Sequence, residues 1–89
     1  MTVVLLKADE ERIVQVLQET VDKLESVEDE VVLDFTSVHR IGSSALRGME
    51  DLASMAENKG LRVVLCGVNV GIYKVLKLVN LAPRFSFVN

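Results

Sequence analysis

The chain has few of the residues that small domains use for covalent or metal cross-links. Its 89 residues include one cysteine, Cys66, and one histidine, His39. A single cysteine cannot form an internal disulfide, and a metal centre needs several ligating side chains at set spacings. We therefore expect no metal and no cofactor. The cysteine usage also indicates a reducing compartment, which for this chain means the cytoplasm.

Aromatic residues, excess charge and long apolar segments are scarce as well. Aromatics make up 4 % of the chain, so a core must come from the aliphatic residues within the 49 % that are hydrophobic. The apolar run at residues 2–6 is too short for a signal peptide or a membrane span. The net charge of -3 argues against a nucleic-acid partner. These absences leave a small globular domain that needs neither metals nor disulfides and whose default partner is not nucleic acid.

Strand-like and helix-like segments alternate along the chain. Residues 2–7, 30–35, 61–67 and 85–89 (TVVLLK, EVVLDF, LRVVLCG and FSFVN) read as strands, and the segments between them have helical spacing. The expected inward positions are Ile13, Leu17, Val21 and Leu24, then Leu46, Met49, Leu52, Ala53 and Ala56, then Ile72, Val75, Leu76 and Val79. The order βαβαβαβ predicts one α/β domain over residues 1–89, with a small, mostly parallel four-stranded sheet and three helices. We expect the strand order 2-1-3-4, with the apolar run at 30–35 covered on both faces.

The longest connection at the carboxyl ends of these strands is the loop from Thr36 to Ser43. Ligands and partners of open parallel sheets meet such loops. Ser43 or Ser44 could cap the helix that follows, which is worth about 1 kcal/mol. The amide end of that helix also favours an anion, either bound or attached as a phosphate. His39, Arg40 and Arg47 stand nearby in sequence.

We find no catalytic constellation in the sequence. Ser43 and Ser44 with His39 lack an identifiable third group, so a nucleophile–base arrangement is not supported. The segment GVNVG at 67–71 lacks the lysine of a phosphate-binding loop, and Asn69 there is a candidate helix cap. We expect Cys66 to be a small core residue and the protein not to be an enzyme.

Residues 31–89 resemble the STAS domain, the module of bacterial anti-sigma factor antagonists that also occurs on sulfate transporters. The landmarks are a strand ending in Asp34, the loop to Ser43-Ser44 and a helix closed by Lys59-Gly60. The strand LRVVLCGV and the segment VLKLVNL follow in the same order. The resemblance implies the fold that the alternation predicts, and a docking surface around residues 36–44 and the second helix.

The family's loop usually reads Asp-Ser-Ser-Gly or Asp-Ser-Gly, and its first serine is the phosphoacceptor. Position by position, the resemblance makes Ser43 the acceptor. Gly42 replaces the acid before it, and Ala45 replaces the glycine after it. The amino terminus also departs, because the family's extra first strand and Gly-x-Leu-Asp stretch are missing. A sheet edge left uncovered invites pairing, which makes a homodimer a candidate.

Three functions remain open. The first is a partner-switching module whose anti-sigma factor or kinase-like partner leaves when Ser43 is phosphorylated. The second is a constitutive adaptor in a transport or signalling assembly. The third is a small anion- or nucleotide-binding domain. The predicted partner- or anion-binding loop comprises Asp34, Thr36, His39, Arg40, Gly42, Ser44 and Arg47.

Overall fold

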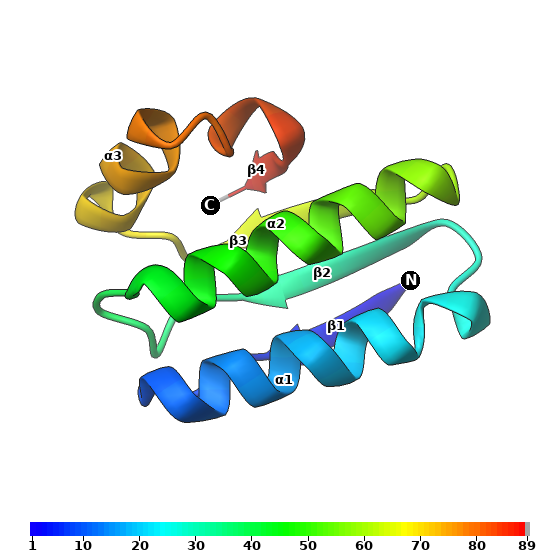
Figure 1. Ribbon diagram of the computed structural model, residues 1–89, viewed down its shortest axis with the longest axis horizontal. Coiled ribbons are helices and arrows are strands. Elements are labelled where there is room, and N and C mark those ends of the chain that lie inside the picture. Colours follow the sequence, from blue (N-terminus) through cyan, green and yellow to red (C-terminus); the bar gives the residue numbers. More distant parts are fainter. Residues whose placement is uncertain (89) are drawn as a thin grey trace.

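The computed structural model describes residues 1–88 and shows strands and helices in strict alternation (Figure 1). The elements are β1 (Thr2–Leu5), α1 (Glu10–Asp22), η1 (Leu24–Ser26), β2 (Glu30–Asp34), α2 (Ser43–Asn58), β3 (Arg62–Cys66), α3 (Val70–Leu78), η2 (Ala82–Arg84) and β4 (Ser86–Val88). This order confirms the predicted α/β class with three α-helices and four strands. The last residue of the predicted final strand, Asn89, lies outside the described residues.

All neighbouring strands are parallel, and their order in the sheet is β1-β2-β3-β4. The predicted order 2-1-3-4 is wrong. That order would place helices on both faces of the sheet, whereas crossovers that all step in one direction with one hand place them on the same face. On that face α1 and α2 pack closely at Gly48, where an added Cβ would lie 3.1 Å from Leu17 Cδ1.

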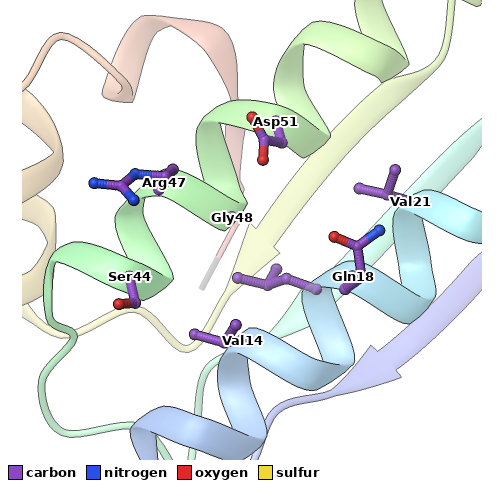
Figure 2. Close-up of a pocket in the computed structure, with 8 residues that line it drawn as sticks. Val14, Gln18, Val21, Ser44, Arg47, Gly48 and Asp51 are labelled. Carbon is purple, nitrogen blue, oxygen red and sulfur yellow. The ribbon is translucent and has the colours of Figure 1, made fainter.

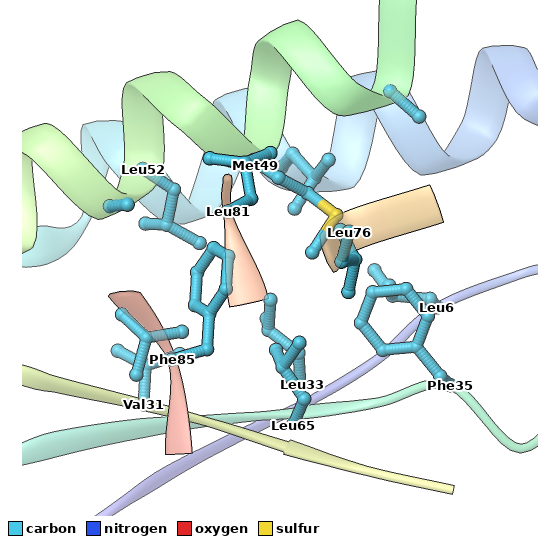
Figure 3. Packing of buried hydrophobic residues seen from close by; sticks show 14 of the residues in the cluster. Leu6, Val31, Leu33, Phe35, Met49, Leu52, Leu65, Leu76, Leu81 and Phe85 are labelled. Carbon is cyan, nitrogen blue, oxygen red and sulfur yellow. The ribbon is translucent and has the colours of Figure 1, made fainter. Parts of the chain in front are cut away.

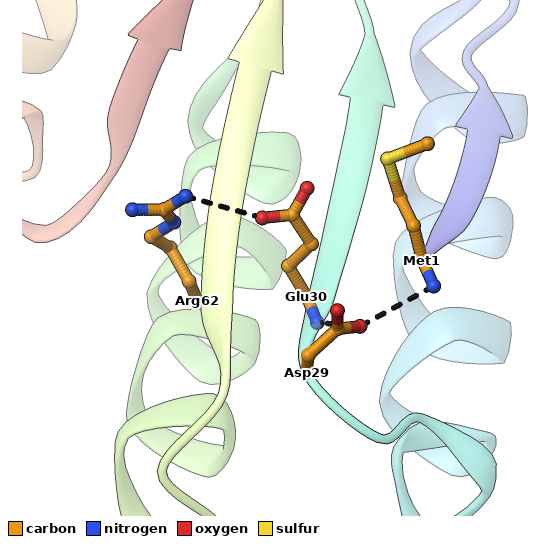
Figure 4. Close-up of polar contacts among 4 residues, drawn as sticks. All are labelled: Met1, Asp29, Glu30 and Arg62. Carbon is orange, nitrogen blue, oxygen red and sulfur yellow. Dashed lines mark hydrogen bonds and ion pairs between the residues drawn. The ribbon is translucent and has the colours of Figure 1, made fainter.

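One face of the sheet carries no helix, and the burial of β2 records this. Val31 and Leu33 are fully buried, whereas Glu30, Val32 and Asp34 are half-buried. The expectation that this strand is covered on both faces is therefore wrong. The bare face carries the exposed side chains of Val3 and Leu5 from β1 as well as a charged pair, in which the Arg62 guanidinium lies 3.3 Å from Glu30 Oε1 (Figure 4). The Met1 amino group pairs with Asp29 at the same end of the sheet, at 3.3 Å.

The core lies between the other face of the sheet and the helices (Figure 3). It is mainly aliphatic, as the composition predicts, with two phenylalanines, Phe35 and Phe85. Most predicted inward positions are buried, but Val21, Leu46 and Val75 are half-buried and Val79 is 45 % exposed. Val79 is exposed because α3 ends at Leu78, one residue before the helical pattern does. The helices are thereby fixed against the sheet with their amino-terminal ends at the carboxyl ends of the strands.

Candidate functional site

The loops that follow β1, β2 and β3 lie at one end of the sheet. They comprise residues 6–9, 35–42 and 67–69. The register aligns Leu5 with Asp34 and Asp34 with Cys66, so the three strands end level with one another. The predicted site residues from Asp34 to Arg47 all belong to the middle loop or to the elements that it joins.

Ser43 is the first residue of α2, and both Ser43 and Ser44 are exposed. The expectation that one of these serines caps the helix is wrong. Gly42 occupies the cap position, and because glycine has no side chain it makes no capping hydrogen bond. The hydroxyl groups of the two serines are thus free of a capping role.

Glu10 caps α2 from a distance. Its Oε1 accepts a hydrogen bond from the Gly42 amide at 2.8 Å, and its Oε2 accepts one from the Ala45 amide at 2.9 Å. Glu10 is the first residue of α1, and the close packing of α1 on α2 brings its carboxylate to the helix end. A carboxylate is the group that the positive end of a helix favours. Because this contact joins residues 32 positions apart, no local sequence pattern predicts it.

Asp34 and Thr36 fix the start of the loop. The amide of Thr36 donates to Asp34 Oδ1 at 2.8 Å, and the Thr36 hydroxyl donates to the same oxygen. These two hydrogen bonds lower the pKa of Asp34 below its ordinary value. Gly67 from the next loop packs against Thr36, with room for no side chain, since a Cβ there would lie 2.6 Å from Thr36 Oγ1. Asp34 therefore shapes the loop, with Thr36, and does not face it as a free acid.

Asn69 joins the loop to α3. Its Nδ2 donates to the carbonyl oxygen of His39 at 2.9 Å, and its Oδ1 accepts the Ile72 amide at 2.8 Å, which caps α3. The sequence predicts the cap but not the bond to His39. The backbone of the loop is consequently held at both ends, by Thr36 and by His39.

The three predicted basic side chains lie on the surface of the middle loop and of α2. His39, Arg40 and Arg47 are all exposed, and neither arginine forms an ion pair within residues 1–88. Arg40 lines a hollow of about 560 Å³ together with residues 8–10 and 41–44. Of the predicted basic residues, Arg40 therefore shares this hollow with both serines.

A second, smaller hollow of about 260 Å³ runs between α1 and α2 (Figure 2). Val14 and Gln18 line it from α1, and Ser44, Arg47 and Asp51 line it from α2. It continues from the serines along α2, so the surface that includes Ser44 extends onto the helix pair.

The described residues offer no group of three or more metal-ligating side chains. Cys66 is half-buried and lies outside the buried core, so the expectation of a core residue is wrong. Burial, followed by the nearby Asp34 carboxylate, raises the pKa of its thiol. A raised pKa makes a thiol a poor nucleophile at neutral pH. Within residues 1–88 no helix has the length and apolar character to cross a membrane.

The fold and the site together define a small α/β domain with a polar loop surface at the amino-terminal end of its second helix. The model of the STAS domain family matches residues 9–89. The chain therefore belongs to the STAS domain family.

Solved structures show the same fold. The crystal structure of a candidate anti-sigma factor antagonist from Thermotoga maritima superposes with a TM-score of 0.80 and 21 % identity, covering 98 % of this chain and 79 % of that one. An NMR structure of the protein TM1081 gives a TM-score of 0.80 and 18 % identity, covering 98 % of this chain and 72 % of that one. Among curated proteins, none matches the chain significantly.

Proposed function

We propose that this domain is a non-enzymatic interaction module that switches protein partners, with Ser43 as its phosphoacceptor. The observation that carries the proposal is the exposure of the Ser43 side chain at the first position of α2, among loops from three strands. A kinase can reach a hydroxyl group there, and a docked partner would cover it. The partner that we propose is an anti-sigma factor or a related kinase-like protein.

The charge around Ser43 supplies a reason for release. Arg40 and Arg47 present unpaired positive charge, which favours a partner with an acidic surface. A phosphate adds about -1.5 to -2 charges at this point, which offsets the arginines and repels acidic groups. Docking at residues 36–44 and the start of α2 should therefore weaken when Ser43 is modified.

The modification itself needs a kinase and a nucleoside triphosphate. The Ser43 hydroxyl oxygen forms a bond to the γ-phosphorus, the bond from that phosphorus to the nucleoside diphosphate breaks, and the hydroxyl proton passes to a base of the kinase. This chain supplies only the acceptor. The module itself has no catalytic role in the proposal.

A constitutive adaptor in a transport or signalling assembly is the second candidate. The position of Glu10 favours the adaptor, because the Glu10 carboxylate already holds the amide end of α2 without any modification. The same contact argues against the anion- or nucleotide-binding alternative, since two of the amides that would hold the ligand are occupied. As a constitutive adaptor, the domain would bind one partner permanently through this site.

Two further expectations belong to this proposal. We place the module in the cytoplasm, where the lone Cys66 would stay reduced. A homodimer stays a prediction and draws support from β1, which pairs with β2 alone and exposes Val3 and Leu5. Sedimentation equilibrium decides it, with a single species at monomer mass over the working concentrations as the contradicting result.

The test is a binding measurement on two variants of Ser43. The probe partner is the protein encoded by a reading frame that flanks this gene, and calorimetry gives its affinity. Ser43→Asp should weaken binding at least tenfold through charge and desolvation, whereas Ser43→Ala should bind as the parent does.

Ser26→Asp is the matched control. Ser26 is an equally exposed serine, but it ends η1 at the opposite end of the strands. It should leave the affinity unchanged. Equal binding by the parent and both Ser43 variants would support the constitutive adaptor and contradict the switch.

A further inference from the structure

The amide end of α2 already holds an anion, and that anion is part of the chain. Both carboxylate oxygens of Glu10 are used, one on the amide of Gly42 and one on the amide of Ala45. A helix start normally leaves its first amides open to water or to a local cap. Here the first turn of α1 and the first turn of α2 are joined through a single side chain.

Gly42 leaves room for this contact. A Cβ at position 42 would lie 2.9 Å from Glu10 Oε2 and 3.2 Å from Glu10 Cδ. Both distances are shorter than ordinary contacts of a Cβ atom, so any larger residue would push the carboxylate away. The absence of a side chain at position 42 and the position of Glu10 therefore depend on each other.

Ser43 lies in sequence between the two amides that Glu10 holds. A phosphate on its hydroxyl would stand beside the Glu10 carboxylate, with two anions at one helix end. Two anions at one helix end repel each other, and the oxygens of the attached phosphate can accept hydrogen bonds from the same two amides. A phosphate on Ser43 would thus compete with the Glu10 carboxylate for the amides of Gly42 and Ala45.

We propose that a phosphate on Ser43 displaces the Glu10 carboxylate from α2 and so detaches the first turn of α1. The inference rests on the proposed function in taking Ser43 as the modified residue. The core positions Ile13 and Leu17 are fully buried and hold the rest of α1 in place. The change is accordingly confined to residues 8–12, of which residues 8–10 border the hollow beside Ser43. Modification then alters the shape of the loop surface as well as its charge.

Four proteins test this coupling. They are the parent chain and Glu10→Gln, each with serine or with phosphoserine at position 43, installed by an expanded genetic code. Phosphoserine should lower the melting temperature of the parent by about 5 °C, through repulsion and the lost contact. In Glu10→Gln it should lower it by much less or raise it, because the phosphate then meets no carboxylate. Equal shifts in the two backgrounds would overturn the proposal.

Glu11→Gln is the matched control for the loss of a negative charge from the first turn of α1. The Glu11 side chain is exposed and makes no hydrogen bond or ion pair to another described residue, so phosphoserine should affect this variant as it affects the parent. If Glu11→Gln reduces the shift as much as Glu10→Gln does, general charge explains the effect and the specific contact does not.

Hydrogen exchange gives a second readout that needs no variant of Glu10. The Ile13 amide donates to the Asp9 carbonyl at 2.9 Å and closes the first turn of α1. Phosphoserine at position 43 should speed its exchange several-fold, and unchanged exchange would contradict the detachment. Neither readout involves a partner. Failure of partner release therefore leaves this coupling standing, and failure of the coupling leaves partner release standing.

Discussion

Gly60 and Gly67 share the same left-handed backbone, with φ of +70° at each, but they have different surroundings. Nothing lies within 4 Å of a Cβ built on Gly60, whereas one on Gly67 would overlap Thr36 Oγ1. Gly60→Ala should therefore cost about 1 kcal/mol of unfolding free energy from backbone strain alone. Gly67→Ala should cost about 3 kcal/mol, because the clash adds to the strain. Urea unfolding of both variants measures the difference, and equal losses would contradict the packing of Gly67 on Thr36.

At the same scale, sequence reasoning identified the exposed residues of the site better than their contacts. His39, Arg40 and Arg47 are all exposed, as their positions in a loop and in the first turns of a helix predict, and Arg40 shares a hollow with Ser43. The Glu10 cap and the bond from Asn69 to His39 were missed, since they join residues 30 or more positions apart. Gly42, directly before the helix, was the one available signal for the Glu10 cap. It indicates that space is left beside the helix start but not which side chain occupies that space.

At the scale of elements, η2 is fixed to α2 by an ion pair. Arg84 Nη2 lies 2.9 Å from Glu57 Oε1, and Arg84 Nε lies 3.0 Å from Glu57 Oε2. The hydrogen bonds from Arg84 hold the pKa of Glu57 below its ordinary value. A carboxyl group whose pKa is lower in the folded state stabilises the fold above its unfolded pKa, and this stability is lost as the pH falls through the folded value.

Glu57→Gln should therefore reduce the loss of melting temperature between about pH 6 and pH 3 relative to the parent. The lowered pKa values of Asp29 and Asp34 add to the acid sensitivity in both proteins and cancel in the comparison. Glu28→Gln serves as the control, because Glu28 is exposed and has no hydrogen bond or ion pair within residues 1–88. An acid profile of Glu57→Gln that equals that of the parent would show that the ion pair contributes nothing.

The elements themselves were largely predictable, and one of them shows the limit. The apolar run in β2 correctly predicts a strand, but it suggests burial on both faces, and Val32 is only half-buried on the bare face. Three consecutive apolar residues do not distinguish a strand that is buried on both faces from one that is buried on a single face. The polar residues Glu30 and Asp34 at its two ends were the signal for a one-sided sheet.

For the whole molecule, alternation fixes the class but not the order of the strands. The same βαβ units allow helices on one face or on both, and only the direction of each crossover decides. Here the order β1-β2-β3-β4 makes every crossover step in the same direction, so the helices lie on one face. The consequence for function is that all three helices begin at the end of the sheet that carries Ser43.

We propose that the docking surface is the end of the sheet that carries Ser43. An NMR titration of the isotopically labelled chain with the protein from the flanking reading frame tests it most directly, because each amide reports its own surroundings. The amide signals of residues 36–47 should shift on binding, while those of residues 24–30 at the opposite end should stay in place. Shifts confined to residues 24–30 or to the bare face of the sheet, with residues 36–47 unchanged, would contradict the account.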